Sequence, residues 1–266
     1  MISYAQNFED VVLHRALYDV SEGFYIDLGA WEPGHDSVTK YFYDQGWSGI
    51  NVEPVPELYQ KLVEQRPRDH NLNVSVGSNV GEVEFQEWVG TGLSSSLPTE
   101  NEAALRMLGY EKRTYQVPVT TLTEIAKTLN GRTVDFLKID VEGSERDVLL
   151  GTNWSTFRPR IILLEAIKPK VIGVESFSYV PTWGDWEPIL LANGYIFALF
   201  DGLNRFYHRS EEPALHAPLS YPANATDGFQ LAPGHWLLPP PAPVPVPPPP
   251  LLARLRGRVQ SWMGGS

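Results

Sequence analysis

The sequence has no cysteine among its 266 residues, which excludes disulfides, thiolate nucleophiles and zinc or iron–sulfur sites held by cysteine. It also has no apolar run as long as the roughly 18 residues that suggest a membrane-spanning helix. Residues 1–6 are polar and carry no basic segment before an apolar stretch, so we expect no signal peptide and a cytoplasmic protein. Acidic residues outnumber basic ones, and the net charge of −11 argues against a general nucleic-acid-binding protein.

Hydrophobic residues make up 42% of the chain and charged residues 20%, which is typical of a globular protein with a hydrophobic core. The composition changes after Trp236, so we predict one domain over residues 1–236. Nine of the 23 prolines lie between Pro239 and Pro250. Because such a run has few amide donors and favours an extended polyproline II conformation, residues 237–250 are predicted to form a proline-rich linker.

The last segment, residues 251–266, has apolar residues at helical spacing, arginines between them and no acidic residue. This pattern predicts a short basic amphipathic tail. Residues 251–262 would then make weak contact with an anionic membrane surface or with another protein. The alternative is a solvated tail, because an isolated helix this short is marginally stable in water.

Apolar segments of strand length alternate with amphipathic segments of helix length along the domain. Strands are predicted at residues 24–28, 49–53, 71–76, 81–88, 134–140 and 160–165. Helices are predicted at residues 7–20, 37–45, 57–65, 103–108, 121–129, 144–150 and 186–193, and residues 90–116 are otherwise expected to be loop. Segments 195–200 and 204–208 predict a hairpin around Asp201-Gly202. This order indicates an α/β fold with a mostly parallel sheet, in which ligands bind beyond the carboxyl ends of the strands.

The first candidate strand contains Asp27 and ends before Gly29. The following turn lacks the G-x-G-x-x-G pattern of dinucleotide-binding proteins, and a carboxylate at Asp27 would repel a pyrophosphate. Both features disfavour a nicotinamide or nucleotide-sugar enzyme. An acidic residue here suits a cofactor with a cationic amino-acid end and no phosphates, such as S-adenosylmethionine.

The second candidate strand ends in Glu53, which follows Asp27 by 26 residues. A carboxylate at such a position accepts hydrogen bonds from both hydroxyls of a ribose. The alternative for Glu53 alone is a solvated strand terminus. Two acidic residues that close neighbouring apolar strands favour the ribose site.

The strand that ends near residue 140 carries three charged residues at alternating positions, namely Lys138, Asp140 and Glu142. Alternation places the first two on one face of the sheet, and the third joins them if the extended conformation continues. A cluster of charges at the carboxyl end of a strand is a candidate site. The alternative is a buried ion pair with a structural role.

Several of these segments resemble the FkbM-type family of S-adenosylmethionine-dependent methyltransferases. The resemblance runs from about Ser3 to His208 and rests on residues 3–10, 24–30, 36–39, 51–54 and 135–145. It implies the class I methyltransferase fold, a Rossmann-like and mostly parallel seven-stranded sheet with a C-terminal antiparallel hairpin and helices on both faces. It also implies S-adenosylmethionine as cofactor.

The family's site residues carry over to matching positions of this chain. By this resemblance, the methionine end of the cofactor is surrounded by Asp27, Gly29 and Ala30, and the ribose is held by Glu53. The resemblance also implies that the adenine is lined by Pro54, Val55, Val76 and Gly77. The transferred methyl group would be faced by Lys138, Asp140 and Glu142. Trp31 departs from the family, in which many members carry a small or polar residue there. A bulky indole at this place is the feature that would fit a degenerate module without catalysis.

Methyl transfer to a hydroxyl is helped by a base that takes the hydroxyl proton. We expect Asp140 or Glu142 to be this base and Lys138 to set its pKa and orientation, with His35 as the alternative base. A divalent metal held by Asp140 and Glu165 is also conceivable, but no clear third ligand is evident, so no metal site is predicted.

The acceptor is expected to be a saccharide or glycan-related molecule. Residues 91–96 are rich in hydroxyl groups, and Trp183 and Trp186 offer flat faces for sugar rings. The alternative is an ordinary surface loop and two core tryptophans. The predicted function is therefore O-methylation of a saccharide hydroxyl, and the alternatives are O-methylation of a non-sugar alcohol or a degenerate module that binds the cofactor or a partner such as a glycosyltransferase.

Overall fold

The computed structural model describes residues 1–173 and 176–239. Residues 1–235 form one compact unit. The predicted basic tail, and the predicted linker apart from residues 237–239, lie outside the described residues. In the described part of the chain, no helix has the length and apolar character needed to cross a membrane.

A seven-stranded sheet lies at the centre of the compact unit, with the strand order β12-β13-β9-β8-β2-β3-β4. The strands are β2 (Phe24–Leu28), β3 (Ser48–Val52), β4 (His70–Leu72), β8 (Phe136–Ile139), β9 (Ile161–Glu165), β12 (Tyr195–Phe200) and β13 (Asn204–Arg209). β13 runs antiparallel to both of its neighbours, β12 and β9, and the other neighbouring pairs of this sheet are parallel. All five residues of the central strand β2 are buried, as expected for a parallel strand covered on both faces. The predicted fold class is confirmed.

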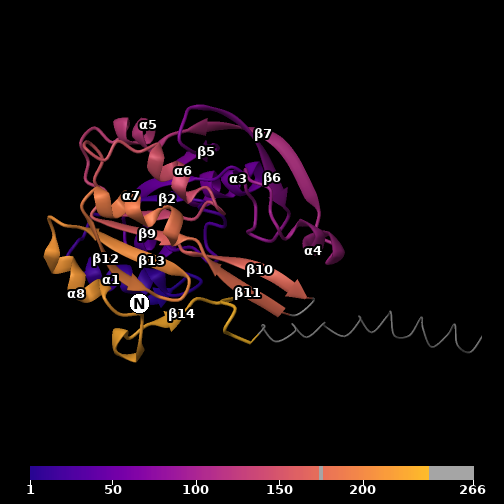
Figure 1. The fold of residues 1–266 in the computed structure, drawn as a ribbon. Helices are drawn as coiled ribbons and strands as arrows, with labels where there is room; N and C mark the ends of the chain where they lie inside the picture. The colour runs from indigo at the N-terminus through magenta and orange to yellow at the C-terminus, as the bar shows by residue number, and fades with distance from the viewer. Residues whose placement is uncertain (174–175, 240–266) are drawn as a thin grey trace, which may run out of the picture. The chain divides into compact units, whose positions relative to one another are not determined.

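Helices cover both faces of this sheet (Figure 1). One face packs against α1 (Glu9–Ala16), α2 (Lys40–Asp44) and α8 (His216–Leu219). The other face packs against α5 (Leu122–Lys127), α6 (Glu145–Leu150) and α7 (Glu187–Ala192). The two remaining helices of four or more residues in the described chain are α3 (Pro56–Gln65) and α4 (Glu102–Met107), and short 3-10 turns occupy Trp183–Asp185, Pro213–Leu215 and Ala225–Asp227.

Strand alternation decides which face each side chain of the sheet joins. In β9, Ile161 and Leu163 pack with α1, whereas Ile162 and Leu164 pack with α6 and α7. By the same alternation, Glu165 points to the α1 face, and so does Lys138, because Phe136 two residues earlier packs with α1. Polar side chains at the strand ends therefore gather on one face of the sheet.

Smaller sheets complete the unit. The strands β5 (Ser75–Val76), β6 (Gly81–Trp88) and β7 (Lys112–Thr120) form a sheet in the order β5-β7-β6. A hairpin is formed by β10 (Ile167–Gly173) and β11 (Ser176–Pro181). Near the chain start, β1 (Ile2–Ser3) pairs in parallel with β14 (Gln230–Leu231), which ties residue 2 to residue 230.

Some predicted elements are wrong in extent or number. The strand predicted at 71–76 is two strands in different sheets. The loop predicted at 90–116 ends earlier, because β7 begins at Lys112, and the hairpin of β10 and β11 was not predicted. The first helix begins at Glu9 rather than residue 7, since Phe8 adopts a left-handed φ of 65°. The helix predicted from residue 37 begins at Lys40.

Candidate active site

The polar residues of the α1 face lie at one edge of the sheet because neighbouring strands stand in register. Asp27 of β2 lies opposite Lys138 of β8. Glu165 ends β9, and Asn204 of β13 lies opposite it. In cross-strand pairs of this kind the two side chains point to the same face. Residues that are far apart in the sequence are thereby brought to the carboxyl ends of the parallel strands.

Lys138 links two carboxylates in this group. Its Nζ lies 3.2 Å from Asp27 Oδ1 and 3.4 Å from Asp140 Oδ2, and it donates a hydrogen bond of 2.7 Å to the Gly29 carbonyl. Desolvation lowers the pKa of Lys138, but the charges of Asp27 and Asp140 outweigh it and raise that pKa above its usual value. Lys138 therefore stays an ammonium ion. Asp27 also accepts a hydrogen bond of 3.1 Å from Thr39 Oγ1, so its carboxylate is held within the protein.

The turn after β2 requires glycine. Gly29 has a φ of 75°, and a Cβ at this position would lie 1.9 Å from the carbonyl oxygen of Asp140. The amides of Gly29 and Ala30 both donate to the Val52 carbonyl, at 3.0 and 3.1 Å. The ends of β2, β3 and β8 are thus packed backbone against backbone, which brings Glu53 and Asp140 to the same edge.

Glu53 is buried and its carboxylate is oriented by backbone amides. Its Oε2 accepts a hydrogen bond of 2.8 Å from the Trp31 amide and its Oε1 accepts one of 2.9 Å from the Val55 amide. Burial raises the pKa of Glu53 to about 7. A carboxylate has about four acceptor sites, so further acceptor sites remain beside these two bonds. Asn73, which the sequence analysis missed, donates to the carbonyls of Glu53 and Pro54 at 2.9 Å and fixes this turn.

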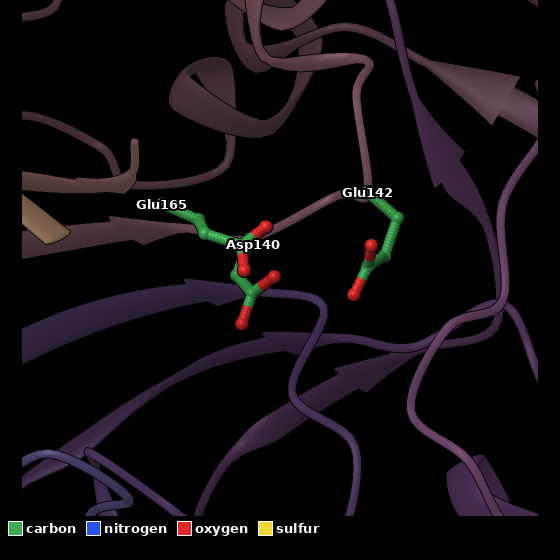
Figure 2. A group of neighbouring side chains, drawn as sticks. All are labelled: Asp140, Glu142 and Glu165. Atoms are coloured by element: carbon green, nitrogen blue, oxygen red, sulfur yellow. The ribbon is translucent and has the colours of Figure 1, made fainter. Parts of the chain in front are cut away.

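Asp140, Glu142 and Glu165 form a group of carboxylates whose oxygens lie within 4.8 Å of one another. Figure 2 shows Asp140 between the other two. Glu142 follows the end of β8 with a left-handed φ of 52°, so a turn rather than an extended strand brings it to Asp140. Desolvation and the nearby charge of Asp140 raise the pKa of Glu142 and of Glu165 well above their usual range. The group therefore holds a proton more readily than ordinary surface carboxylates.

The polar loop predicted to cover the acceptor lies against this group. Ser95 Oγ donates a hydrogen bond of 2.9 Å to the Glu142 carbonyl. The hydroxyls of Ser96 and Ser144 lie 3.3 Å apart. The loop is thus fixed to the turn that carries Glu142.

Other predicted site residues lie elsewhere or have other contacts. His35, the alternative base, is half exposed and its Nδ1 lies 3.1 Å from Asp36 Oδ2. Val76 is buried in the apolar core beside α5 and α6, and the carbonyl of Gly77 packs against Gly151. The adenine contacts of Val76 and Gly77 stay a prediction. Trp31 has a φ of 49° and its ring packs edge-on against His35 at 5.9 Å.

Several acidic side chains are buried, and this predicts how stability depends on pH. Burial raises the pKa of Glu9 to about 8 and that of Asp10 to about 6, beside about 7 for Glu53. A carboxyl whose pKa is raised by folding contributes stability below its unfolded pKa, and this contribution is lost as pH rises through the folded pKa. We expect the free energy of unfolding to fall between pH 6 and 8 by about 2 kcal/mol for Glu9 alone, which lowers the Tm by roughly 4–8 °C.

Thermal unfolding at a series of pH values measures this effect. The variant Glu9→Gln should show a flatter decline than the wild type. A Tm that rises steadily from pH 6 to 8 in the wild type would contradict the buried carboxyls.

A mostly parallel seven-stranded sheet, with β13 reversed and acidic residues at the carboxyl ends of β2, β3 and β8, is the architecture of class I methyltransferases. The model of the methyltransferase FkbM domain matches residues 17–197. The chain therefore belongs to the FkbM methyltransferase family. No curated protein sequence matches the chain.

Solved structures of methyltransferases are similar to this chain. A methyltransferase FkbM from Methylobacillus flagellatus has 15% identity and a TM-score of 0.42, with 71% of this chain and 44% of that chain covered. The chain thus spans less than half the length of that protein. A 1,6-didemethyltoxoflavin-N1-methyltransferase from Burkholderia thailandensis, solved with bound 1,6-didemethyltoxoflavin and S-adenosylhomocysteine, has 13% identity and a TM-score of 0.38, with 76% of each chain covered. A TehB-like methyltransferase from Corynebacterium glutamicum has 9% identity and a TM-score of 0.37, with 75% of this chain and 87% of that chain covered.

Proposed function

We propose that this protein transfers the methyl group of S-adenosylmethionine to a hydroxyl of a saccharide or glycan-related acceptor. The observation that carries the proposal is the group of Asp140, Glu142 and Glu165 beside the ammonium of Lys138, at the same edge of the sheet as Glu53. Membership of the FkbM family supports methyl transfer. The saccharide rests on the hydroxyl-rich loop beside Glu142, since Trp186 is a core residue that is 1% exposed, and a cytoplasmic location rests on the sequence alone.

The residues at the ends of β2 and β3 fit S-adenosylmethionine. Glu53 has acceptor sites left for ribose hydroxyls. The turn after β2 lies at the same edge of the sheet as Glu53, and its residue Gly29 has no side chain. In the proposed site Ala30 lies near the methionine end, and Pro54 and Val55 flank the adenine. Asp27 is already paired with Lys138, so we propose that it acts at the methionine end together with that ammonium. When bound, S-adenosylmethionine supplies a methyl group that its sulfonium has already activated.

The carboxylates take the proton of the acceptor. A neutral sugar hydroxyl is a weak nucleophile, so a base that accepts its proton during attack accelerates the reaction. A raised pKa makes the ionised carboxylate of Glu142 a stronger base than an ordinary glutamate, and Asp140, which lies next to it, is the alternative. As the oxygen–methyl bond forms and the methyl–sulfur bond breaks, the electron pair stays on sulfur and the proton moves to the carboxylate. Lys138 orients Asp140 through their ion pair.

The same carboxylates bear on the question of a metal. From the sequence, Asp140 and Glu165 were the two candidate metal ligands and a third was missing. In the structure, Glu142 lies close enough to both to be the third ligand. We keep proton transfer without metal as the proposal, and an assay with EDTA tests it.

The test is methyl transfer from S-adenosylmethionine labelled in its methyl group. Purified protein would be incubated with monosaccharides, oligosaccharides and simple alcohols, each with and without EDTA. We expect label in at least one saccharide, equally with and without EDTA. Label only in simple alcohols would overturn the saccharide, and activity lost with EDTA but restored by Mg²⁺ would overturn the metal-free mechanism. Cofactor binding without transfer to any acceptor would favour a degenerate module.

A further inference from the structure

The side chain of Trp31 has no part in the proposed mechanism, although it belongs to the turn after β2. Trp31 follows Gly29 by two residues, and its backbone amide donates the hydrogen bond of 2.8 Å to Glu53 Oε2. Its side chain is partly exposed. The indole is therefore accessible to a ligand beside the residues assigned to the cofactor.

The indole of Trp31 lies against two other segments near the site. Its ring meets the ring of His35 edge-on, with the ring centres 5.9 Å apart and the planes at 76°. Its Cε2 lies 4.0 Å from the place that a Cβ on Gly92 would take. Gly92 belongs to the hydroxyl-rich loop, in which Ser95 Oγ donates to the carbonyl of Glu142. The indole thus lies where the turn after β2 meets the loop that is fixed to the turn of the proposed base.

The face of this ring and its N–H are both unused in the described part of the chain. The ring contact of Trp31 there is the edge-on one with His35, and no arginine or lysine of that part lies over its face. Its Nε1 makes no hydrogen bond with the described residues. Trp183 differs, because Arg205 lies over its ring at 4.8 Å and Phe200 packs against it at 5.2 Å. Trp31 therefore offers a flat apolar face together with a hydrogen-bond donor.

The backbone of Trp31 is unfavourable for a bulky residue. Its φ of 49° lies in the left-handed region, which glycine and asparagine adopt far more readily than tryptophan. Strained residues of this kind persist where the surrounding structure holds them, and they are concentrated at active sites and ligand sites. Since a smaller residue would fit this backbone better, the contribution of tryptophan here is its side chain.

A sugar ring matches both features of the indole. The C–H groups on one face of a pyranose are apolar and pack on a flat aromatic ring, and its hydroxyl oxygens accept from an indole N–H. The hydroxyl-rich loop and the carboxylates of the site also favour a ligand with several hydroxyls. An acyclic polyol has the hydroxyls but no rigid apolar face. The indole therefore favours a pyranose over an open-chain alcohol.

We propose that Trp31 selects the acceptor by stacking its indole on one face of the pyranose whose hydroxyl is methylated. Nε1 of the indole donates to a hydroxyl oxygen of the same acceptor. This inference rests on the proposed function and deepens it, because the preferred acceptor is then a pyranoside with one face free of axial hydroxyls. Trp31 determines specificity and takes no part in the transfer of the proton.

The experiment compares a set of methyl pyranosides with the acyclic polyol sorbitol as acceptors in the labelled methyl-transfer assay. We expect kcat/KM of the wild type to be about tenfold higher for at least one pyranoside, as for one aromatic stacking contact. Trp31→Asn removes the indole and suits the left-handed backbone, so the variant should fold. It should raise KM for this pyranoside about tenfold, change kcat less, and abolish the preference over sorbitol.

Two further variants separate the indole from a general effect on the fold. Trp31→Phe keeps an aromatic face and should retain part of the preference for the pyranoside. Trp183→Phe is the matched control, because the Trp183 ring is already covered by Arg205, and it should keep the wild-type ratio of the two kcat/KM values. A residue that only supports the fold would change kcat/KM for both acceptors alike.

A second measurement uses the wild type alone. With S-adenosylhomocysteine and the pyranoside bound, NMR should show nuclear Overhauser effects between the Trp31 ring protons and the C–H protons on one face of the sugar. An unchanged acceptor ratio in Trp31→Asn, without such effects in the wild type, would overturn the stacking but leave saccharide methylation intact. The same unchanged ratio with weaker S-adenosylmethionine binding would assign the indole to the cofactor instead. No transfer to any saccharide by protein that binds S-adenosylmethionine would overturn the proposed function and this inference with it.

Discussion

Glu53→Ala should lose at least 100-fold in affinity for S-adenosylmethionine, measured by calorimetric titration of the purified protein. The carboxylate of Glu53 is the group proposed to accept both ribose hydroxyls, and hydrogen bonds to a charged group contribute about 1.5–3 kcal/mol each. Two such bonds together account for about 3 kcal/mol or more, which corresponds to a factor of at least 100. Binding that matches the wild type would overturn the ribose assignment.

Glu53→Gln is the matched control for this result. Its amide oxygen still accepts one backbone hydrogen bond, so we expect an intermediate affinity and a fold close to the wild type. The pH dependence of the affinity distinguishes the effect of the charge of Glu53 from the effect of the shape of its side chain. Because the pKa of Glu53 is raised to about 7, the wild-type affinity should fall as the pH drops below 7, whereas that of Glu53→Gln should not.

Glu142→Gln should lower kcat by a factor of about 100 to 10,000, the usual contribution of a general base. Affinity for S-adenosylmethionine should change little, because Glu142 is assigned to proton transfer and not to the cofactor. The measurement is kcat with a saccharide acceptor beside a calorimetric Kd. Glu124→Gln, on the exposed side of α5, is a carboxyl control that should keep the wild-type rate.

The pH profile distinguishes Glu142 from Asp140 as the base. The charge of Asp140 raises the pKa of Glu142, so Asp140→Asn should lower that pKa. If Glu142 is the base, Asp140→Asn keeps substantial activity and moves the acidic limb of the profile to lower pH. A complete loss of kcat in Asp140→Asn, with activity retained in Glu142→Gln, would assign the base to Asp140 instead.

Much of the sheet is predictable from the sequence because its central strands are short, apolar and buried on both faces. Asp27 and Glu53 interrupt or follow such strands, and a charge at that position has few structural explanations. Lys138 is predictable for the same reason. The meeting of Glu142 with Glu165 is not, since it depends on a left-handed turn at a residue other than glycine.

The missed strands have physical explanations as well. In β7 only Val117 is buried, and Pro118 has the appearance of a strand breaker. Proline is tolerated there because β5 pairs with β7 only at Val119 and Thr120. The Asn73 side chain separates β4 from β5 by binding the Glu53–Pro54 turn, a contact between segments about 20 residues apart that no local pattern reveals.

The family match ends at residue 197, but the folded unit extends to residue 235 and begins at residue 1. The apolar cluster on the α1 face draws on Val12 and Leu13 before the match and on Phe206 and Leu219 after it. A gene trimmed to residues 17–197 would encode a sheet without β13, with one face stripped of two of its covering helices. Such a fragment is a poor choice for expression, whereas residues 1–235 contain the whole folded unit and the whole of this cluster.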